Sequence, residues 1–198
     1  MNTSTMIRSR LVLASLALAS AFALGACSLD AMESEGGLED GLGEEETIGS
    51  TEQEISSGWT PYTSEEYPPI ICDSGSLMSA VHCTGSKCDN IQAYCQPTGG
   101  SLGATYWTSY FSEEGTNYRY CNSGYWVTGI ACTGGNCDNI SLMCSQITNK
   151  GWGNCHWTGW VSEEYGGYLT FAAGYFPQGV QCSGSNCDNK RFYVCQAQ

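Results

Sequence analysis

The chain has 198 residues, with 20 acidic and 7 basic side chains, and a formal net charge of −13 at neutral pH. A protein this acidic has no basic stripe with which to neutralise phosphates, so the composition excludes nucleic-acid binding. The 13 cysteines instead indicate an exported protein held together by disulfides.

The first 26 residues have the layout of an export signal. Arg8 and Arg10 precede an uncharged apolar run at 11–26 that ends in small residues. The run is about 16 residues long, shorter than the roughly 20 that a membrane-spanning helix needs. Residues 1–26 are therefore predicted to be a cleaved signal peptide.

The end of the run, Leu24-Gly25-Ala26-Cys27, resembles the lipobox of bacterial lipoproteins, in which the Cys is acylated and becomes the first mature residue. The odd number of cysteines agrees with lipidation of Cys27, because removing this residue leaves twelve cysteines, four in each of three repeats. The resemblance implies lipidation at Cys27 in a bacterial cell envelope, and Ser28 favours the outer membrane. The alternative is ordinary cleavage near Ala26, which would give a secreted protein.

The segment that follows the lipid site is acidic, with ten acids, no base and no aromatic residue in 28–57. Such a composition buries too little apolar surface to offset the entropy of ordering. Residues 27–57 are therefore expected to be a lipidated Cys followed by a disordered tether, with a reach of about 30 Å.

One unit then occurs three times, in about residues 58–96, 106–145 and 156–198. Each copy has a Trp-Thr step, a Ser-Glu-Glu step five residues later and a Cys-x-Gly-x-x-Cys-Asp-Asn segment. A period of 48 to 50 residues predicts a closed threefold body in which each copy completes its core against its neighbours.

The repeat is rich in Trp, Tyr, Thr and Gly, which is typical of short strands and turns. In the second copy, residues 125–132 and 140–144 alternate like strands with one buried face, and residues 133–136 between them are turn formers. We therefore expect an all-β fold, in which three small antiparallel sheets pack around a pseudo-threefold axis.

The repeat resembles that of the vitelline membrane outer layer proteins. The resemblance rests on Trp107, Cys-Asn-Ser-Gly at 121–124, the Gly-Ile pair at 129–130 and Asp-Asn-Ile-Ser-Leu-Met-Cys at 138–144. It covers residues 58–198 and implies a disulfide-rich β-prism of three sheets, carried here behind a disordered tether. The chain departs from the family in its added cysteines at 88, 137 and 187.

The twelve repeat cysteines suggest a pairing by symmetry. The first two copies have a Cys eleven residues before their second one, whereas the third copy has Phe171 there and an additional Cys155. Twelve cysteines allow very many pairings, but symmetry favours one long bond per repeat and one short bond across each turn. The expected bonds are Cys72–Cys95, Cys121–Cys144, Cys155–Cys195, Cys83–Cys88, Cys132–Cys137 and Cys182–Cys187. The competing interpretation is a zinc site of three cysteines per repeat, but His82 and His156 do not recur, so no metal site is predicted.

Nine of the ten acids in residues 58–198 belong to the recurring Glu-Glu and Asp-Asn steps. These steps can hydrogen-bond to turn backbone, form an oxygen cage for calcium, or bind sugar hydroxyls. Threefold repetition argues against one asymmetric catalytic site, so no catalytic residue and no required cofactor are predicted. The predicted ligand-binding residues are Glu65, Glu66, Asp89, Asn90, Glu113, Glu114, Asp138, Asn139, Glu163, Glu164, Asp188, Asn189, Tyr110 and Trp160.

Two further expectations concern the aromatic pairs and the third copy. The pairs Trp59/Tyr62, Trp107/Tyr110 and Trp157/Trp160 share one spacing, which predicts a core Trp with an exposed partner. Lys190-Arg191 interrupts only the third copy, where Cys187 and Cys195 are eight residues apart instead of seven. The added residue predicts a bulge that alters the third of three binding places.

The leading functional prediction is a surface-anchored, lectin-like module that binds glycans or cell-surface polysaccharide. The lipid on Cys27 is predicted to anchor the protein in the membrane. The alternatives are a structural coat lipoprotein and a prism that docks on a membrane or a partner. An oligosaccharide-acting enzyme remains a weaker alternative, because the resembled family has been linked to chitooligosaccharide-type chemistry. The oligomeric state and the sugar stay open.

Overall fold

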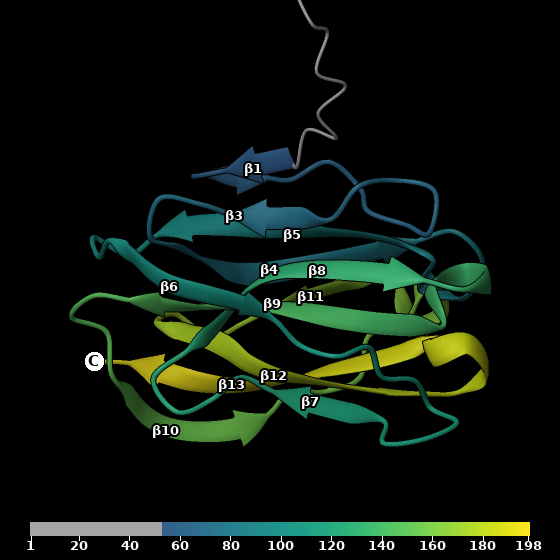
Figure 1. Ribbon diagram of the computed structural model, residues 1–198. Coiled ribbons are helices and arrows are strands. Elements are labelled where there is room, and N and C mark those ends of the chain that lie inside the picture. The colour runs from purple at the N-terminus through teal and green to yellow at the C-terminus, as the bar shows by residue number, and fades with distance from the viewer. Residues whose placement is uncertain (1–52) are drawn as a thin grey trace, which may run out of the picture. The chain divides into compact units, whose positions relative to one another are not determined.

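The computed structural model describes residues 53–198, which form an all-β structure (Figure 1). The predicted signal peptide, the predicted lipid site at Cys27 and the greater part of the predicted tether lie outside the described residues. Within residues 53–198, no helix is long and apolar enough to cross a membrane.

Thirteen strands form three sheets in this part of the chain. The strands are β1 (Gln53–Ile55), β2 (Gly58–Trp59), β3 (Ile70–Cys72), β4 (Ser76–Thr84), β5 (Asn90–Pro97), β6 (Leu102–Trp107), β7 (Tyr118–Tyr120), β8 (Trp126–Thr133), β9 (Asn139–Ile147), β10 (Trp152–Trp157), β11 (Tyr168–Thr170), β12 (Tyr175–Ser183) and β13 (Asn189–Ala197). Sheet I has the order β1-β3-β8-β9-β6, sheet II β10-β13-β12-β7 and sheet III β11-β4-β5-β2. Short 3₁₀ turns are η1 (Ser86–Cys88), η2 (Gly135–Cys137), η3 (Glu163–Tyr165) and η4 (Ser185–Cys187).

The three repeats exchange strands in a closed cycle. β3 of the first repeat pairs antiparallel with β8 of the second, β7 of the second pairs with β12 of the third, and β11 of the third returns to β4 of the first. Each sheet therefore contains three strands of one repeat and one strand of the repeat before it, and sheet I also contains β1. Because the cycle closes, no repeat completes its sheet alone, as the period predicts.

The strand β1 lies inside the segment expected to be a disordered tether. It runs parallel to β3, with Gln53 opposite Ile70, and the Asp73 N–H donates to the Ile55 carbonyl at 3.1 Å. Without β1, the outer edge of β3 would present unpaired backbone groups. The folded body therefore includes residues 53–55, which precede the predicted boundary at residue 58.

The central hairpins have the same register in all three sheets. Cys83, Cys132 and Cys182 lie opposite Ile91, Ile140 and Lys190, respectively. Each hairpin has one irregularity in its first strand, between Met78 and Ala80, Val127 and Gly129, and Pro177 and Gly179. The regular bulge is therefore shared by the three copies.

The additional bulge expected in the third copy is wrong. Val127 lies opposite Cys144 in sheet I, and Pro177 lies opposite Val194 in sheet II, so Val194 occupies the register position of Cys144. Cys195 is simply the next residue along, and its side chain points to the other face because side chains alternate along a strand. The spacing of eight reflects a moved cysteine rather than an inserted residue.

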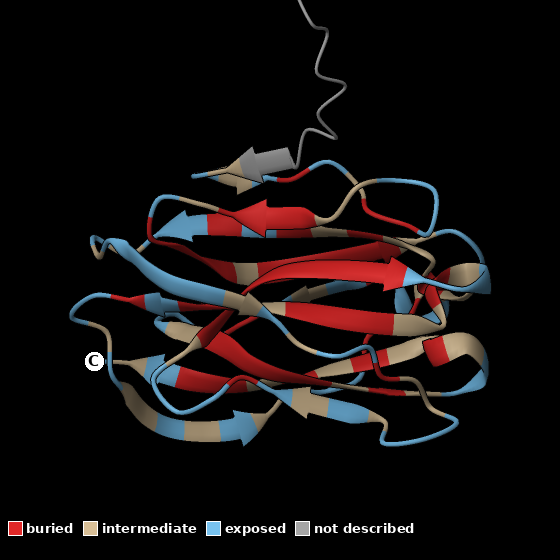
Figure 2. Cartoon of the chain, in the orientation of Figure 1, coloured by how far each residue is buried: buried red, intermediate tan, exposed pale blue. Residues whose placement is uncertain are grey.

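The main core takes buried residues from all three sheets, including Ile70, Val81, Leu142, Val180 and Phe192. Figure 2 shows buried residues along β8, β9 and β12, and exposed ones along β6 and β10. A second cluster consists of Leu77, Trp126, Ile147, Phe176 and Cys195. The core is thus shared between the sheets and contains aliphatic and cystine side chains.

The expectation of one buried face per strand is wrong for β8, which is buried from Trp126 to Cys132. Its outer face carries Gly129, over which the side chains of Met143 and Ile71 lie. The strand β8 lies between β3 and β9 and has small outward residues. Side chains of these two strands therefore cover its outer face, while the core covers its inner face.

The expectation that the recurring Trp packs in the core is also wrong. Trp59 and Trp107 are 38% and 36% exposed, and Trp157 is half-buried. They lie on β2, β6 and β10, which are edge strands of their sheets. Trp126, which does not recur, is the fully buried tryptophan of the core.

The six disulfides are those expected from symmetry, Cys72–Cys95, Cys83–Cys88, Cys121–Cys144, Cys132–Cys137, Cys155–Cys195 and Cys182–Cys187. Cys72–Cys95 ties β3 of sheet I to β5 of sheet III, and Cys121–Cys144 ties the end of β7 to β9 of sheet I. The third long bond joins β10 to its neighbour β13 inside sheet II. In that copy Phe171 packs on Phe192 instead, with ring centroids 5.4 Å apart.

Candidate functional site

The recurring acids lie where the turns η1, η2 and η4 contact one another. In each turn a glycine with φ near +80° precedes a residue with φ near +60°, which is Asn136 in η2 and Asn186 in η4. Gly and Asn tolerate this backbone, so the turn chemistry predicted at 133–136 is confirmed. The first copy places Lys87 at the same φ of 59°.

The first glutamate of each Glu-Glu step binds the turn of another repeat. Its carboxylate accepts hydrogen bonds from backbone N–H groups that the turn itself leaves unpaired. The contacts are Glu65 with the Asn136 N–H at 3.1 Å, Glu113 with the Asn186 N–H at 2.6 Å and the Cys187 N–H at 3.2 Å, and Glu163 with the Lys87 N–H at 2.8 Å. These charge-assisted bonds connect each repeat to the next one around the cycle.

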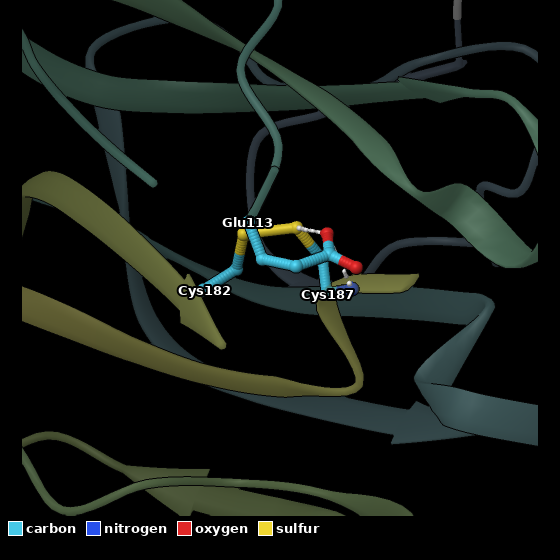
Figure 3. Close-up of side chains that lie close together, drawn as sticks. All are labelled: Glu113, Cys182 and Cys187. Atoms are coloured by element: carbon cyan, nitrogen blue, oxygen red, sulfur yellow. Dashed lines mark hydrogen bonds between the residues drawn. A yellow bond between two sulfur atoms is a disulfide. The ribbon is translucent and has the colours of Figure 1, made fainter. Parts of the chain in front are cut away.

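Figure 3 shows the Glu113 carboxylate beside the Cys182–Cys187 disulfide. Its Oε2 lies 3.4 Å from Cys187 Sγ, but sulfurs in a disulfide carry no thiolate and do not ligate zinc. Both carboxylate oxygens of Glu113 already accept N–H groups. The contacts therefore favour a structural role for this carboxylate over a place in a calcium cage.

The first glutamate also faces the aspartate of its own repeat. Burial raises the pKa of Asp138, and the adjacent Glu113 carboxyl raises it further. Burial acts in the same direction on Glu113, but hydrogen bonds from the Asn186 and Cys187 N–H groups, among others, bring its pKa below the ordinary value. Asp138 therefore holds a proton to higher pH than Glu113, and Asp188 does so beside Glu163.

Lys190 lies beside these turns and is the one buried lysine or arginine among residues 53–198. Its side chain is 2% exposed, and in the strand register it occupies the position that Ile91 and Ile140 have in the other two copies. Its Nζ donates to the Cys187 carbonyl at 2.7 Å and to the Cys88 carbonyl at 3.3 Å. Burial lowers its pKa to about 8, although nearby carboxylates act in the opposite direction.

The predicted binding residues thus separate into two groups. The first glutamate and the aspartate of one repeat lie together, as the prediction of a shared site requires. However, the glutamates bind backbone N–H groups, and the carboxyl groups contact each other. The second glutamates, Glu66, Glu114 and Glu164, are exposed. Asn90 does meet tyrosines, in a pocket of about 350 Å³ lined by Pro61, Tyr62, Tyr67 and Asn90.

The outer face of sheet III carries a cluster of rings around a polar pair, His82 and Gln92. Tyr168 stacks on His82 at 3.7 Å, and the Trp59 ring meets both Tyr94 and Tyr168 edge to face. The Gln92 amide lies 2.8 Å from His82 Nδ1 and donates to the Tyr62 hydroxyl at 3.2 Å. Burial lowers the His82 pKa, which keeps the imidazole neutral at neutral pH.

The outer face of sheet II repeats this arrangement with different polar residues. Gln181 lies opposite Arg191 just as His82 lies opposite Gln92, and the Arg191 Nε donates to Gln181 Oε1 at 2.8 Å. Rings gather around the pair, and they are Tyr118, Tyr120, Trp157, Trp160 and Tyr193. The predicted site residue Trp160 therefore lies beside Arg191, while Tyr110 is exposed.

Sheet I has no such polar pair. Ala131 and Ser141 occupy the register positions of His82 and Gln92, and the Ser141 hydroxyl donates to the Thr108 carbonyl at 2.8 Å. Two of the three outer faces therefore carry an aromatic cluster with hydrogen-bonding side chains. The face that lacks the polar pair, called the degenerate face below, belongs to the second copy's hairpin. The sequence had instead predicted that the third copy would differ.

Sequence reasoning missed His82, Gln92, Gln181 and Arg191 as a matched set. Gln92 and Arg191 each lie four residues after the inner Cys of the turn, so an alignment of the three copies position by position contains the signal. This signal is weak because the polar residues differ between the copies, whereas the acids recur in all three.

Comparison of the chain with protein-family models, curated proteins and solved structures finds no match to any of them. The resemblance to vitelline membrane outer layer proteins therefore stays a prediction.

Proposed function

We propose that this protein is a glycan-binding lipoprotein of the bacterial cell surface, whose three sheets form a pseudo-threefold β-prism. The closed exchange of β3, β7 and β11 and the core shared by all three sheets support the prism. Under this proposal, the outer faces of the sheets are the binding surfaces, and the turns with their acids hold one end of the prism together.

The aromatic clusters on the outer faces of sheets II and III carry the proposal. Exposed rings include Trp59 at 38%, Trp160 at 40%, Tyr120 at 39% and Tyr168 at 63%. Aromatic rings offer flat apolar surfaces to the C–H faces of sugars, and adjacent polar side chains orient the hydroxyls. Grouped exposed rings around polar pairs on two faces are what a lectin-like surface requires.

The envelope location rests on the predicted signal, the resemblance of residues 24–27 to a lipobox and the six disulfides, which suit an oxidising compartment. A lipid at Cys27 would anchor the chain, and the acidic segment would hold the folded body away from the membrane surface.

A glycan array with the mature chain carrying Cys27→Ser tests the proposal. We expect retention of specific glycans, and about tenfold weaker binding in the double variant Trp59→Ala, Trp157→Ala, because each change removes a stacking surface. Trp107→Ala on the degenerate face is the matched control and should bind like the parent. Absence of any retained glycan would favour the structural coat, and turnover of the bound oligosaccharides would favour the enzyme.

A further inference from the structure

The guanidinium of Arg191 contacts two indole rings on the outer face of sheet II. Its Cζ lies 4.7 Å from the Trp157 ring centroid and 4.6 Å from that of Trp160. The Nε donates to Gln181 Oε1 at 2.8 Å, and the Gln181 amide in turn donates to Asn117 Oδ1 at 3.3 Å. Stacking and this chain of bonds fix the guanidinium before any ligand arrives.

The two Nη groups of Arg191 are left for a ligand. None of the hydrogen bonds among residues 53–198 uses them, and the one that Arg191 donates from its side chain comes from Nε. Arg191 is half-buried, so its charge is only partly hydrated. A guanidinium fork in this state pairs best with a carboxylate or sulfate, which it binds with two parallel N–H groups.

Rings next to Arg191 provide the surface for a sugar ring. Tyr120 and Tyr193 meet edge to face at 5.4 Å, and Tyr120 also meets Trp157 at 5.8 Å and Tyr118 at 5.4 Å. Gly179 has no side chain, so the Tyr120 ring lies directly over the backbone of β12. The face thus combines a group of exposed and half-buried aromatic rings with one oriented cation.

The other two faces have neutral residues at the position of Arg191, which are Gln92 in sheet III and Ser141 in sheet I. The chain as a whole carries a net charge of −13 and repels anions at long range. A single fixed cation in this field serves recognition at short range rather than general attraction.

We propose that the outer face of sheet II binds an acidic sugar residue, with its carboxylate or sulfate paired to the Nη groups of Arg191 and its ring stacked on the neighbouring aromatics. This inference rests on the proposed glycan-binding function and names the ligand class of one of its faces.

Isothermal titration of the mature Cys27→Ser chain tests the proposal with three probes, namely an oligogalacturonate, its carboxyl-reduced neutral form and a sulfated galactan oligosaccharide. We expect the better acidic probe to bind at least tenfold more tightly than the neutral form, and the preferred probe identifies the anion. Arg191→Gln should remove the preference, and Arg191→Lys, which keeps the charge without the fork, should restore part of it. Trp107→Ala on sheet I, the face without a polar pair, is the control and should leave the preference intact.

Equal binding of acidic and neutral probes by the parent chain, or a preference that survives in Arg191→Gln, would overturn this inference while leaving glycan binding in place. Absence of binding to all three probes and to a glycan array would overturn the proposed function and this inference with it. Melting curves of the Arg191 variants identify any loss of fold, and Arg191→Lys keeps the comparison decisive in that event.

Discussion

Replacing Lys190 by methionine should stabilise the protein at neutral pH. The lysine side chain is 2% exposed and stands where the other two copies have Ile91 and Ile140. Burial lowers its pKa from 10.5 to about 8, even though Asp188 and three other carboxylates favour the charged form. Desolvation therefore outweighs ion pairing at this site.

The magnitude follows from that pKa difference. Lowering the pKa from 10.5 to about 8 corresponds to about 3 kcal/mol lost from the free energy of unfolding when the lysine is charged. Methionine removes this penalty and keeps an unbranched chain of similar length, but it forfeits the hydrogen bonds to the carbonyls of Cys187 and Cys88, at about 1 kcal/mol each. We expect a net gain of about 1–2 kcal/mol at pH 7.

The pH dependence gives the sharper test. Between about pH 8 and 10.5 the unfolded lysine keeps its proton while the folded one has released it, so the unfolded state binds more protons and stability rises with pH. Guanidinium unfolding at pH 7, 8, 9 and 10, with disulfides intact, should show the gain of Lys190→Met over the parent shrinking across this window. Lys87→Met is the control for a half-buried lysine. A Lys190→Met protein less stable than its parent at pH 7, or a difference independent of pH, would refute the reasoning.

Three other predictions follow. Glu113→Gln should lower the free energy of unfolding by about 1–3 kcal/mol, because the amide accepts the Asn186 N–H more weakly, while glycan affinity stays unchanged in titrations; unchanged stability with lost binding would assign the acid to the ligand site. Removing the Cys121–Cys144 bond with a double Ala variant should cost about 2–5 kcal/mol in denaturant unfolding, and a smaller loss would mean that the packed sheets hold without it. Cys27→Ser should abolish labelling by a fatty-acid analogue and release the protein from membranes; retained label would point to another anchor.

The repeat, the turns and the cysteine pairs could be predicted from the sequence, because each rests on a short spacing or on the comparison of one copy with another. Cys83–Cys88 and its two counterparts span five residues, with glycines where the backbone needs positive φ. The displaced Cys155 revealed its partner because Phe171 had replaced the usual cysteine. Fold class and covalent framework therefore follow from local spacing and from comparing one copy with another.

The faces of the strands and the partners of the acids depended on tertiary structure. The irregularity between Val127 and Gly129 changes which residues point outward, and a strand's period of two turns one such shift into an exchange of faces. Glu113 meets Asn186, more than 70 positions away, only because the repeats exchange strands. The sequence shows Lys190 only as part of a basic pair in the third copy. It is buried because strand register rather than residue type decides which side chains face the interior.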